Sequence, residues 1–186
     1  MTLFLLIDTP LIQPLHPEQI ITRNDYPVHN EHILKIYFRV FQAGFGATLP
    51  MVPVINKDLG IPFAVGDSQE VIEYNTSLQR YLDQNPHAEY FLLDGNHKTT
   101  AAALTGNGIS CLVLKTDNDI LYAQALLAKG EFFSLSINNT ISENVDNLRE
   151  HFFQTREFQT VSYKTRKMVR ERVIPQYMID YYDHFV

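Results

Sequence analysis

Residues Tyr90–Leu114 read YFLLDGNHKTTAAALTGNGISCLVL, and this stretch decides the fold. Tyr90–Leu93 is a short apolar run that predicts a buried strand. The alanine-rich segment Asn96–Leu104 predicts a helix that ends at Gly106, and Ile109–Leu114 predicts a second strand. A strand, a turn, a helix and a strand within about 25 residues form a compact α/β unit.

The turn between the first strand and the helix has residue types that suit a phosphate. Asp94 and Gly95 end the strand, and Asn96, His97 and Lys98 open the helix. The first N–H groups of a helix have no acceptor within the helix, and the helix dipole adds positive charge there. Gly95 lets a ligand approach the backbone, Lys98 supplies a mobile cation, and His97 can donate to an anion. Asp94 suits a metal-bound phosphate or a hydroxyl that is to be deprotonated.

The same residues have a structural interpretation, which stays open from the sequence alone. Aspartate is common as a helix N-cap, so Asp94 can be only a cap. His97 can be a half-buried packing residue, and Lys98 a solvated surface charge.

Other segments place further elements around this unit. Leu3–Ile7 predicts a first strand, and Leu11–Ile21, with two prolines, predicts loop or edge backbone. Glu31–Ala43 predicts a helix. Leu49–Ile55 predicts a strand, and its two prolines favour an edge position or a place at the start of the strand. Asp67–Gln84 predicts a helix with Asp67 as its N-cap.

Composition and charge limit the function classes. The chain has 186 residues with 15 basic and 21 acidic side chains, a net charge of −6 that disfavours a general nucleic-acid binder. The single cysteine, Cys111, excludes an intramolecular disulfide and a zinc site built from cysteines. No stretch approaches the roughly 18 apolar residues of a membrane span, and the run at Leu3–Ile7 is too short for a signal peptide. We therefore expect a soluble, cytoplasmic protein without a membrane partner.

The chain divides into a core, residues 1–118, and a mostly helical C-terminal extension, residues 119–186. Within the extension, Lys164–Arg172 (KTRKMVRER) is typical of the wet face of an amphipathic helix, and a grip on a phosphate-rich partner is the alternative. The aromatic C-terminus at Tyr177–Phe185 predicts a face that packs on the core or on a second copy in a homo-oligomer.

The residues resemble a known family. DGNHKTTAAALTG followed by ISCLVL resembles the DGHHR-type box of the ParB/sulfiredoxin superfamily. The helix Glu31–Ala43, a glycine and LPMVPVI are similar to the family's helix, glycine and "PIVV" strand. LHPEQII, Leu15–Ile21, resembles the "L-x-P-x-E" loop of the free-serine kinases in this superfamily. The resemblance covers about residues 11–116.

The resemblance implies an α/β (α+β) fold with a small ParB-like mixed-sheet core. It also implies an ATP- or ADP-dependent phosphotransferase, with Mg²⁺, that acts on a small hydroxylated substrate such as an amino acid. In the serine-kinase-like branch the loop glutamate, here Glu18, acts as the base toward the substrate hydroxyl. Asp94 and His97 are the other catalytic candidates, and Asp94 is the candidate metal ligand. The turn that would bind the nucleotide falls on Gly95, Asn96, His97, Lys98 and Thr99.

The positions at which this chain departs from the family pattern indicate which branch of the family it resembles. Sulfiredoxins have a catalytic cysteine where this chain has Asn96, and Cys111 lies in a predicted strand. ParB partition proteins have a double-arginine box where this chain has His97 and Lys98. Sulfiredoxin chemistry and DNA partitioning are therefore disfavoured. The family often has a short hairpin where this chain has the inserted segment 57–89.

Two other functions remain open. One is a non-enzymatic nucleotide-binding regulatory module that signals through the helical extension. The other is a ParB-like nuclease or nucleic-acid-associated protein, which only the basic segment Lys164–Arg172 supports.

Overall fold

The computed structural model describes residues 10–23, 26–28, 30–134 and 137–186, so the predicted strand at Leu3–Ile7 lies outside the described residues. The strands are β1 Leu11–Leu15, β2 Ile20–Thr22, β3 Val52–Asn56, β4 Tyr90–Leu92, β5 Ile109–Leu114 and β6 Gln159–Thr160. The α-helices are α1 Glu31–Gln42, α2 Gln69–Gln84, α3 Asn96–Leu104, α4 Asp117–Ala128, α5 Ile141–Thr155, α6 Val161–Arg170 and α7 Gln176–Phe185. Short 3₁₀ helices are η1 Pro17–Gln19, η2 Gly46–Thr48 and η3 Lys57–Leu59.

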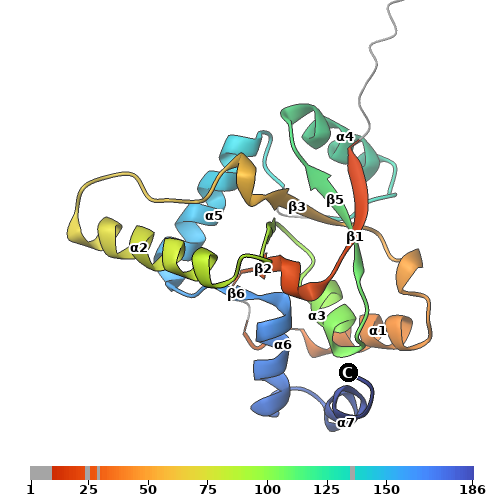
Figure 1. Ribbon diagram of the computed structural model, residues 1–186. Coiled ribbons are helices and arrows are strands. Elements are labelled where there is room, and N and C mark those ends of the chain that lie inside the picture. The colour runs from red at the N-terminus through yellow and green to blue at the C-terminus, as the bar shows by residue number, and fades with distance from the viewer. Residues whose placement is uncertain (1–9, 24–25, 29, 135–136) are drawn as a thin grey trace, which may run out of the picture.

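The described strands form one mixed sheet in the order β1-β5-β3-β4-β2-β6 (Figure 1). β3 runs parallel to β5, and β2 runs parallel to β4. The other neighbours, β1–β5, β3–β4 and β2–β6, are antiparallel. The expected α/β architecture with a mixed sheet is confirmed.

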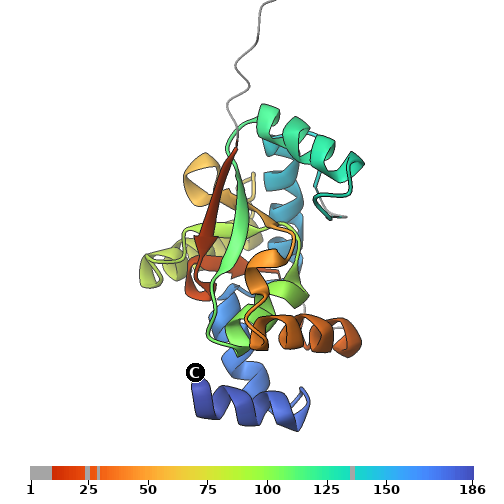
Figure 2. The same ribbon diagram turned by 90° about the vertical axis from the view of Figure 1, so that its right-hand side faces the viewer.

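Helices cover both faces of the sheet (Figures 1 and 2). Val52 and Val54 of β3 belong to one apolar cluster, and their neighbour Ile55 belongs to the other, as the alternation of side chains along a strand requires. The first cluster includes buried side chains of α1, α3, α6 and α7, and the second includes those of α2, α4 and α5. The chain is therefore a three-layer sandwich.

The unit predicted from the quoted stretch forms with the expected bounds. α3 spans Asn96–Leu104 and β5 spans Ile109–Leu114, while β4 ends one residue before the predicted Leu93. Ala101 and Ala102 are fully buried, and their small side chains let α3 pack closely on the sheet.

The prediction of an edge position for Leu49–Ile55 is wrong, because β3 lies between β5 and β4 in the middle of the sheet. Pro53 is tolerated there because it lies at the start of β3, opposite Leu93, just past the end of β4. The N–H of Leu93 donates to the Pro53 carbonyl at 3.1 Å, so the missing N–H of Pro53 costs the sheet a bond only at its margin.

Side chains with a hydroxyl group cap three of the helices in the described part of the chain, and one of these caps differs by a residue from the prediction. The predicted N-cap Asp67 is wrong: Ser68 caps α2, and its side chain accepts from the N–H of Val71. Threonines cap α5 and α6: Thr140 accepts from the N–H of Glu143, and Thr160 accepts from the N–H of Tyr163. A hydroxyl or a carboxylate satisfies the same backbone donor, so the sequence alone does not choose between adjacent candidates.

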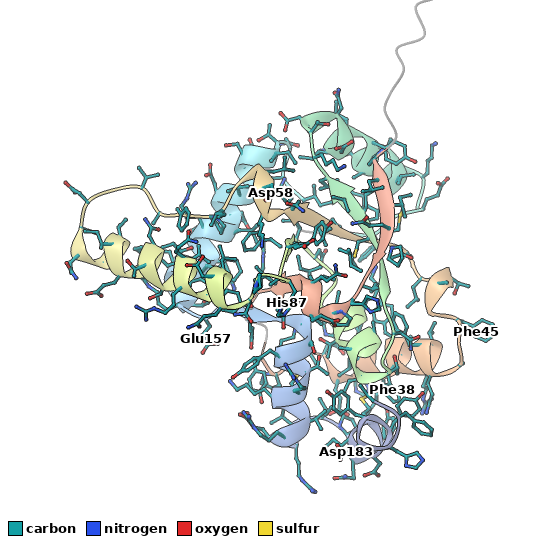
Figure 3. The ribbon with its side chains drawn as sticks, in the orientation of Figure 1. Phe38, Phe45, Asp58, His87, Glu157 and Asp183 are labelled. Carbon is teal, nitrogen blue, oxygen red and sulfur yellow. The ribbon has the colours of Figure 1, made fainter. Side chains whose placement is uncertain are left out.

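The helical extension contributes to every layer of the sandwich. Its β6 pairs with β2, and Leu148 and Phe152 of α5 are fully buried in the second apolar cluster. α7 packs on α1, where Phe38 contacts the rings of Tyr177 and Tyr181 edge-on. In Figure 3, Phe38 lies at this junction, whereas Phe45, which is 62% exposed, projects from the turn after α1. The boundary at residue 118 stays a prediction.

None of the helices in the described part of the chain has the length and apolarity needed to cross a bilayer.

We expect Phe152→Ala to lower the free energy of unfolding by about 3–5 kcal/mol, as for other buried phenylalanines. The side chain has 0% exposure and contacts the rings of Phe91 in β4 and Phe158. Urea unfolding followed by circular dichroism checks this. Because the contact joins the extension to the core, a single cooperative transition is expected.

The matched control is Ile36→Ala on α1, where the side chain is 62% exposed. It should change the stability by about 0.5 kcal/mol or less. Two separate transitions, with Phe152→Ala shifting only one, would show that the extension is an independent domain.

Candidate functional site

The candidate site lies at the edge of the sheet where β2 and β4 end. Since these strands are parallel, their carboxyl ends meet at one edge, and α3 begins there. Thr22, the last residue of β2, donates from its hydroxyl to Oδ1 of Asn96 at 2.5 Å. We use the name edge cluster for Arg23, Asp94, Asn96, Lys98 and Lys164, the polar side chains gathered at this edge.

Gly95 fixes the geometry of the turn. It is the N-cap of α3 with φ 102° and ψ 27°, the left-handed region that favours glycine. A Cβ atom on Gly95 would lie 2.5 Å from Cγ1 of Val52 in β3. The missing side chain of Gly95 therefore makes room for the Val52 side chain of this protein's own central strand. The expectation that Gly95 lets a ligand approach the backbone stays a prediction.

Asp94 is half-buried, and protein donors hold its carboxylate. Oδ1 accepts from the N–H of Gly95 at 2.6 Å, and Oδ2 accepts from the hydroxyl of Ser134 at 2.9 Å. Ser134 lies between α4 and α5, so Asp94 joins the turn to the extension. Asp94 is not the N-cap of α3, which excludes the simplest structural interpretation of this residue.

Lys98 is not the mobile cation that the sequence predicts, nor a solvated surface charge. It is 5% exposed, and its Nζ donates to the carbonyls of Pro50 at 3.0 Å and Met51 at 3.4 Å. Burial lowers the pKa of Lys98, and the nearby carboxylate of Asp94 opposes that shift. A first-turn side chain that points back along its helix reaches β3, so Lys98 anchors α3 to the residues just before that strand.

His97 and Thr99 are the other two candidates in the first turn of α3, and they differ in burial. His97 is half-buried. Thr99 is fully buried, and its hydroxyl donates to the carbonyls of Gly95 and Asn96, each at 3.1 Å. The Thr99 hydroxyl is therefore used within the helix rather than toward a ligand.

Lys164 of α6 is the cation that the sequence analysis missed. It is fully buried, and its Nζ lies 3.5 Å from Oδ1 of Asn96, a long hydrogen bond. The prediction of a wet face for Lys164–Arg172 fails at this residue, although Arg166, Arg170 and Arg172 are exposed. The signal was the helical spacing, which places Lys164 on the same buried stripe as Val161 and Met168.

Arg23 approaches the edge cluster from the opposite face of the sheet. Its Nη2 donates to Oδ1 of Asn147 in α5 at 2.5 Å. Burial lowers the pKa of Arg23, and the charge of Asp94 opposes this. The pKa of His151, also in α5, is lowered by burial and then by the positive charge of Arg23. Asp94 thus acts on cations from both sides of the sheet edge.

Glu18 does not join this site. It is exposed in η1, which precedes β2, so it lies at the opposite edge of the sheet from the carboxyl end of that strand. Glu18 lines a pocket of about 110 Å³ together with Ala103 and Gly106, at the far end of α3. Asn96 and Ala103 are separated by about 10 Å of helix. Glu18 and the first turn of α3 do not line this pocket together, and the role of Glu18 as a base stays a prediction.

Asp94 is the only candidate metal ligand from the sequence, and the described residues contain no group of three or more His, Cys, Asp or Glu side chains that could hold a metal. Mg²⁺ is commonly bound through one or two carboxylates together with substrate phosphates. One carboxylate beside several cations therefore fits a Mg²⁺ ion that is held mainly by a nucleotide, and it does not fit a metal centre built by the protein.

No family model matches this sequence, and neither a curated protein nor a solved structure matches it. The resemblance to the ParB/sulfiredoxin superfamily therefore stays a hypothesis that rests on the residues of the chain.

We expect Gly95→Ala to destabilise the protein by about 3 kcal/mol or more, because it combines a left-handed φ with the overlap against Val52. Gly44→Ala is the control. Gly44 has φ +82°, and no atom of the described residues beyond its chain neighbours lies within 4 Å of an added Cβ. Its substitution therefore measures only the cost of a left-handed backbone with a side chain, about 1–2 kcal/mol. Chemical denaturation of both variants measures the difference. Equal losses would show that Val52 moves aside at no cost.

Proposed function

We propose that this protein binds the phosphate groups of a nucleotide at the edge cluster. The observation that carries the proposal is charge. Among the described residues, the edge cluster brings the cations of Arg23, Lys98 and Lys164 together with the carboxylate of Asp94 at the positive end of α3. Cations at low exposure are costly, so their concentration here favours an anionic ligand.

The resemblance to the ParB/sulfiredoxin superfamily supports the same assignment. In the branch that the chain resembles, the turn that aligns with Asp94–Lys98 holds nucleotide phosphates. Here the backbone of that turn keeps the expected strand–Asp–Gly–helix order. Two cations of the cluster come from elsewhere: Arg23 follows β2 and Lys164 lies in α6.

A binding role fits the geometry better than catalysis with Glu18 as the base. A general base must lie within hydrogen-bond reach, or one water molecule, of the proton that it takes. Glu18 lies at the other edge of the sheet, beside Gly106 at the far end of α3. We therefore favour the non-enzymatic nucleotide-binding module over the kinase that the sequence alone suggests.

Phosphotransfer is the second candidate, and the position of Asp94 favours it. The carboxylate is half-buried beside the first turn of α3, where it is placed to hold a Mg²⁺ ion or to accept a proton from a substrate hydroxyl. A bound Mg²⁺ would neutralise phosphate charge. ATP turnover in the presence of a panel of hydroxylated amino acids tests this candidate.

We expect ADP and ATP, with and without Mg²⁺, to raise the unfolding midpoint of the protein. A ligand that binds only the folded state adds about 2.7 kcal/mol of stability at 100 times its dissociation constant. Lys164→Met keeps the length of the side chain and removes its charge, so it should weaken nucleotide affinity by about 10-fold or more. Thermal-shift titration gives both quantities.

The control for Lys164→Met is Arg166→Met on the same helix, where the side chain is exposed. It should leave nucleotide affinity within about twofold, the range in which a screened surface charge acts. Titrations in which no nucleotide shifts the midpoint at millimolar concentration would overturn the proposed function.

Glu18→Gln should leave the affinity for nucleotide unchanged within about twofold, because this residue lies at the opposite edge of the sheet and is exposed. Isothermal titration of the wild-type protein and the variant with Mg²⁺–ADP measures it. A loss of about 10-fold or more would return Glu18 to the site.

A further inference from the structure

Gln159, in the C-terminal extension, has a buried donor that the fold does not use. The residue is 6% exposed in β6, the two-residue edge strand. Its Nε2 atom is buried and has no hydrogen-bond acceptor among the residues that the structure describes. An unsatisfied buried amide costs about 1–3 kcal/mol, so its presence calls for an explanation.

The position of Gln159 places this donor at the edge cluster. β6 pairs with β2 in antiparallel register, and Gln159 lies directly opposite Thr22. Residues directly opposite in an antiparallel pair have their side chains on the same face. The hydroxyl of Thr22 donates to Asn96 in the first turn of α3, so the amide of Gln159 lies on the face where α3 begins.

A second unused donor lies one residue further along the chain. Nε of Arg23 is buried and has no acceptor within the described part of the chain, although Nη2 of the same side chain donates to Asn147. Thr22 and Arg23 are adjacent at the carboxyl end of β2, where α3 presents its positive end. Since side chains alternate along a strand, Arg23 lies on the opposite face of the sheet from Gln159, and its unused donor is separate from that of Gln159.

We infer that Gln159 is a ligand-binding residue: its Nε2 donates to a phosphoryl oxygen held at the edge cluster. This inference rests on the proposed function, and it adds which chemical group the site selects. A deprotonated phosphoryl group offers only acceptors, so it satisfies the buried N–H of Gln159 without leaving a donor of its own unpaired. The helical extension thereby completes the site with Gln159 as well as Lys164.

The decisive variant is Gln159→Met, which is close in size and has no donor. If Gln159 serves the ligand, the variant should bind pyrophosphate and Mg²⁺–ADP about 10-fold or more weakly, the effect of losing one hydrogen bond to a charged group. Its unfolding midpoint without ligand should stay equal or rise, because the unsatisfied amide is gone. A residue with a purely structural role would lower that midpoint and leave the affinity unchanged.

Gln154→Met is the matched control, since Gln154 is an exposed glutamine in the neighbouring helix α5. It should not change the affinity for either probe. Gln159→Glu serves as a second variant that keeps the shape and replaces the donor by an anion, so the test does not depend on the folding of Gln159→Met alone. It should also weaken the binding of both probes.

Thermal-shift titrations of the three variants and the wild-type protein separate the outcomes. Binding by the wild-type protein with a selective loss in the Gln159 variants supports the inference. Equal binding by the wild-type protein and Gln159→Met overturns it while leaving the proposed function intact. Absence of any shift with pyrophosphate, ADP or ATP in the wild-type protein overturns the proposed function and this inference together.

Discussion

The close approach of the Asp94–Gly95 turn to the central strand β3 is the constraint on which the rest of the structure depends. Because Val52 occupies the space where a Cβ atom of residue 95 would lie, the turn accepts only glycine without displacement. Lys98 strengthens the same junction by donating to the backbone just before β3. With the start of α3 fixed in this way, its first turn is held at the carboxyl ends of β2 and β4. Polar side chains from both faces of the sheet then meet at this edge.

The polar groups of that edge carry a cost that ordinary packing does not explain. A fully buried lysine, and a glutamine amide with no acceptor among the described residues, lie where apolar side chains of similar size would be cheaper. The hydrogen bonds of Asp94 to Gly95 and Ser134 show that the edge is ordered rather than loosely packed. Stability given up at a well-ordered site is the pattern expected of a binding surface.

Local sequence patterns predicted the elements but not the directions of their side chains. The β4–α3–β5 unit follows from apolar runs, an alanine-rich helix and a terminating glycine, all of which act within a few residues. Proline disfavours a central strand because it has no N–H to donate to a neighbouring strand. The central position of β3 was missed because Pro53 lies opposite a residue just beyond the end of β4, where the missing bond falls outside that strand. The sequence predicted solvent-accessible side chains for Lys98 and Lys164, because lysine is usually exposed. Tertiary contacts bury both side chains instead. The separation of Glu18 from the turn depends on strand order, which no local pattern contains.

The place of β2 in the sheet has a consequence for how the chain folds. β2 is formed by Ile20–Thr22, yet its two neighbours come from residues 90–92 and 159–160. Pairings across such long stretches of chain are slow to form, because the entropy of closing the loop is lost before the contact is gained. During synthesis, an early strand with apolar Ile20 and Ile21 must therefore wait until most of the chain has left the ribosome. Over that interval its edges are open to pairing with other chains, so the vulnerable period for aggregation is the time before β6 emerges.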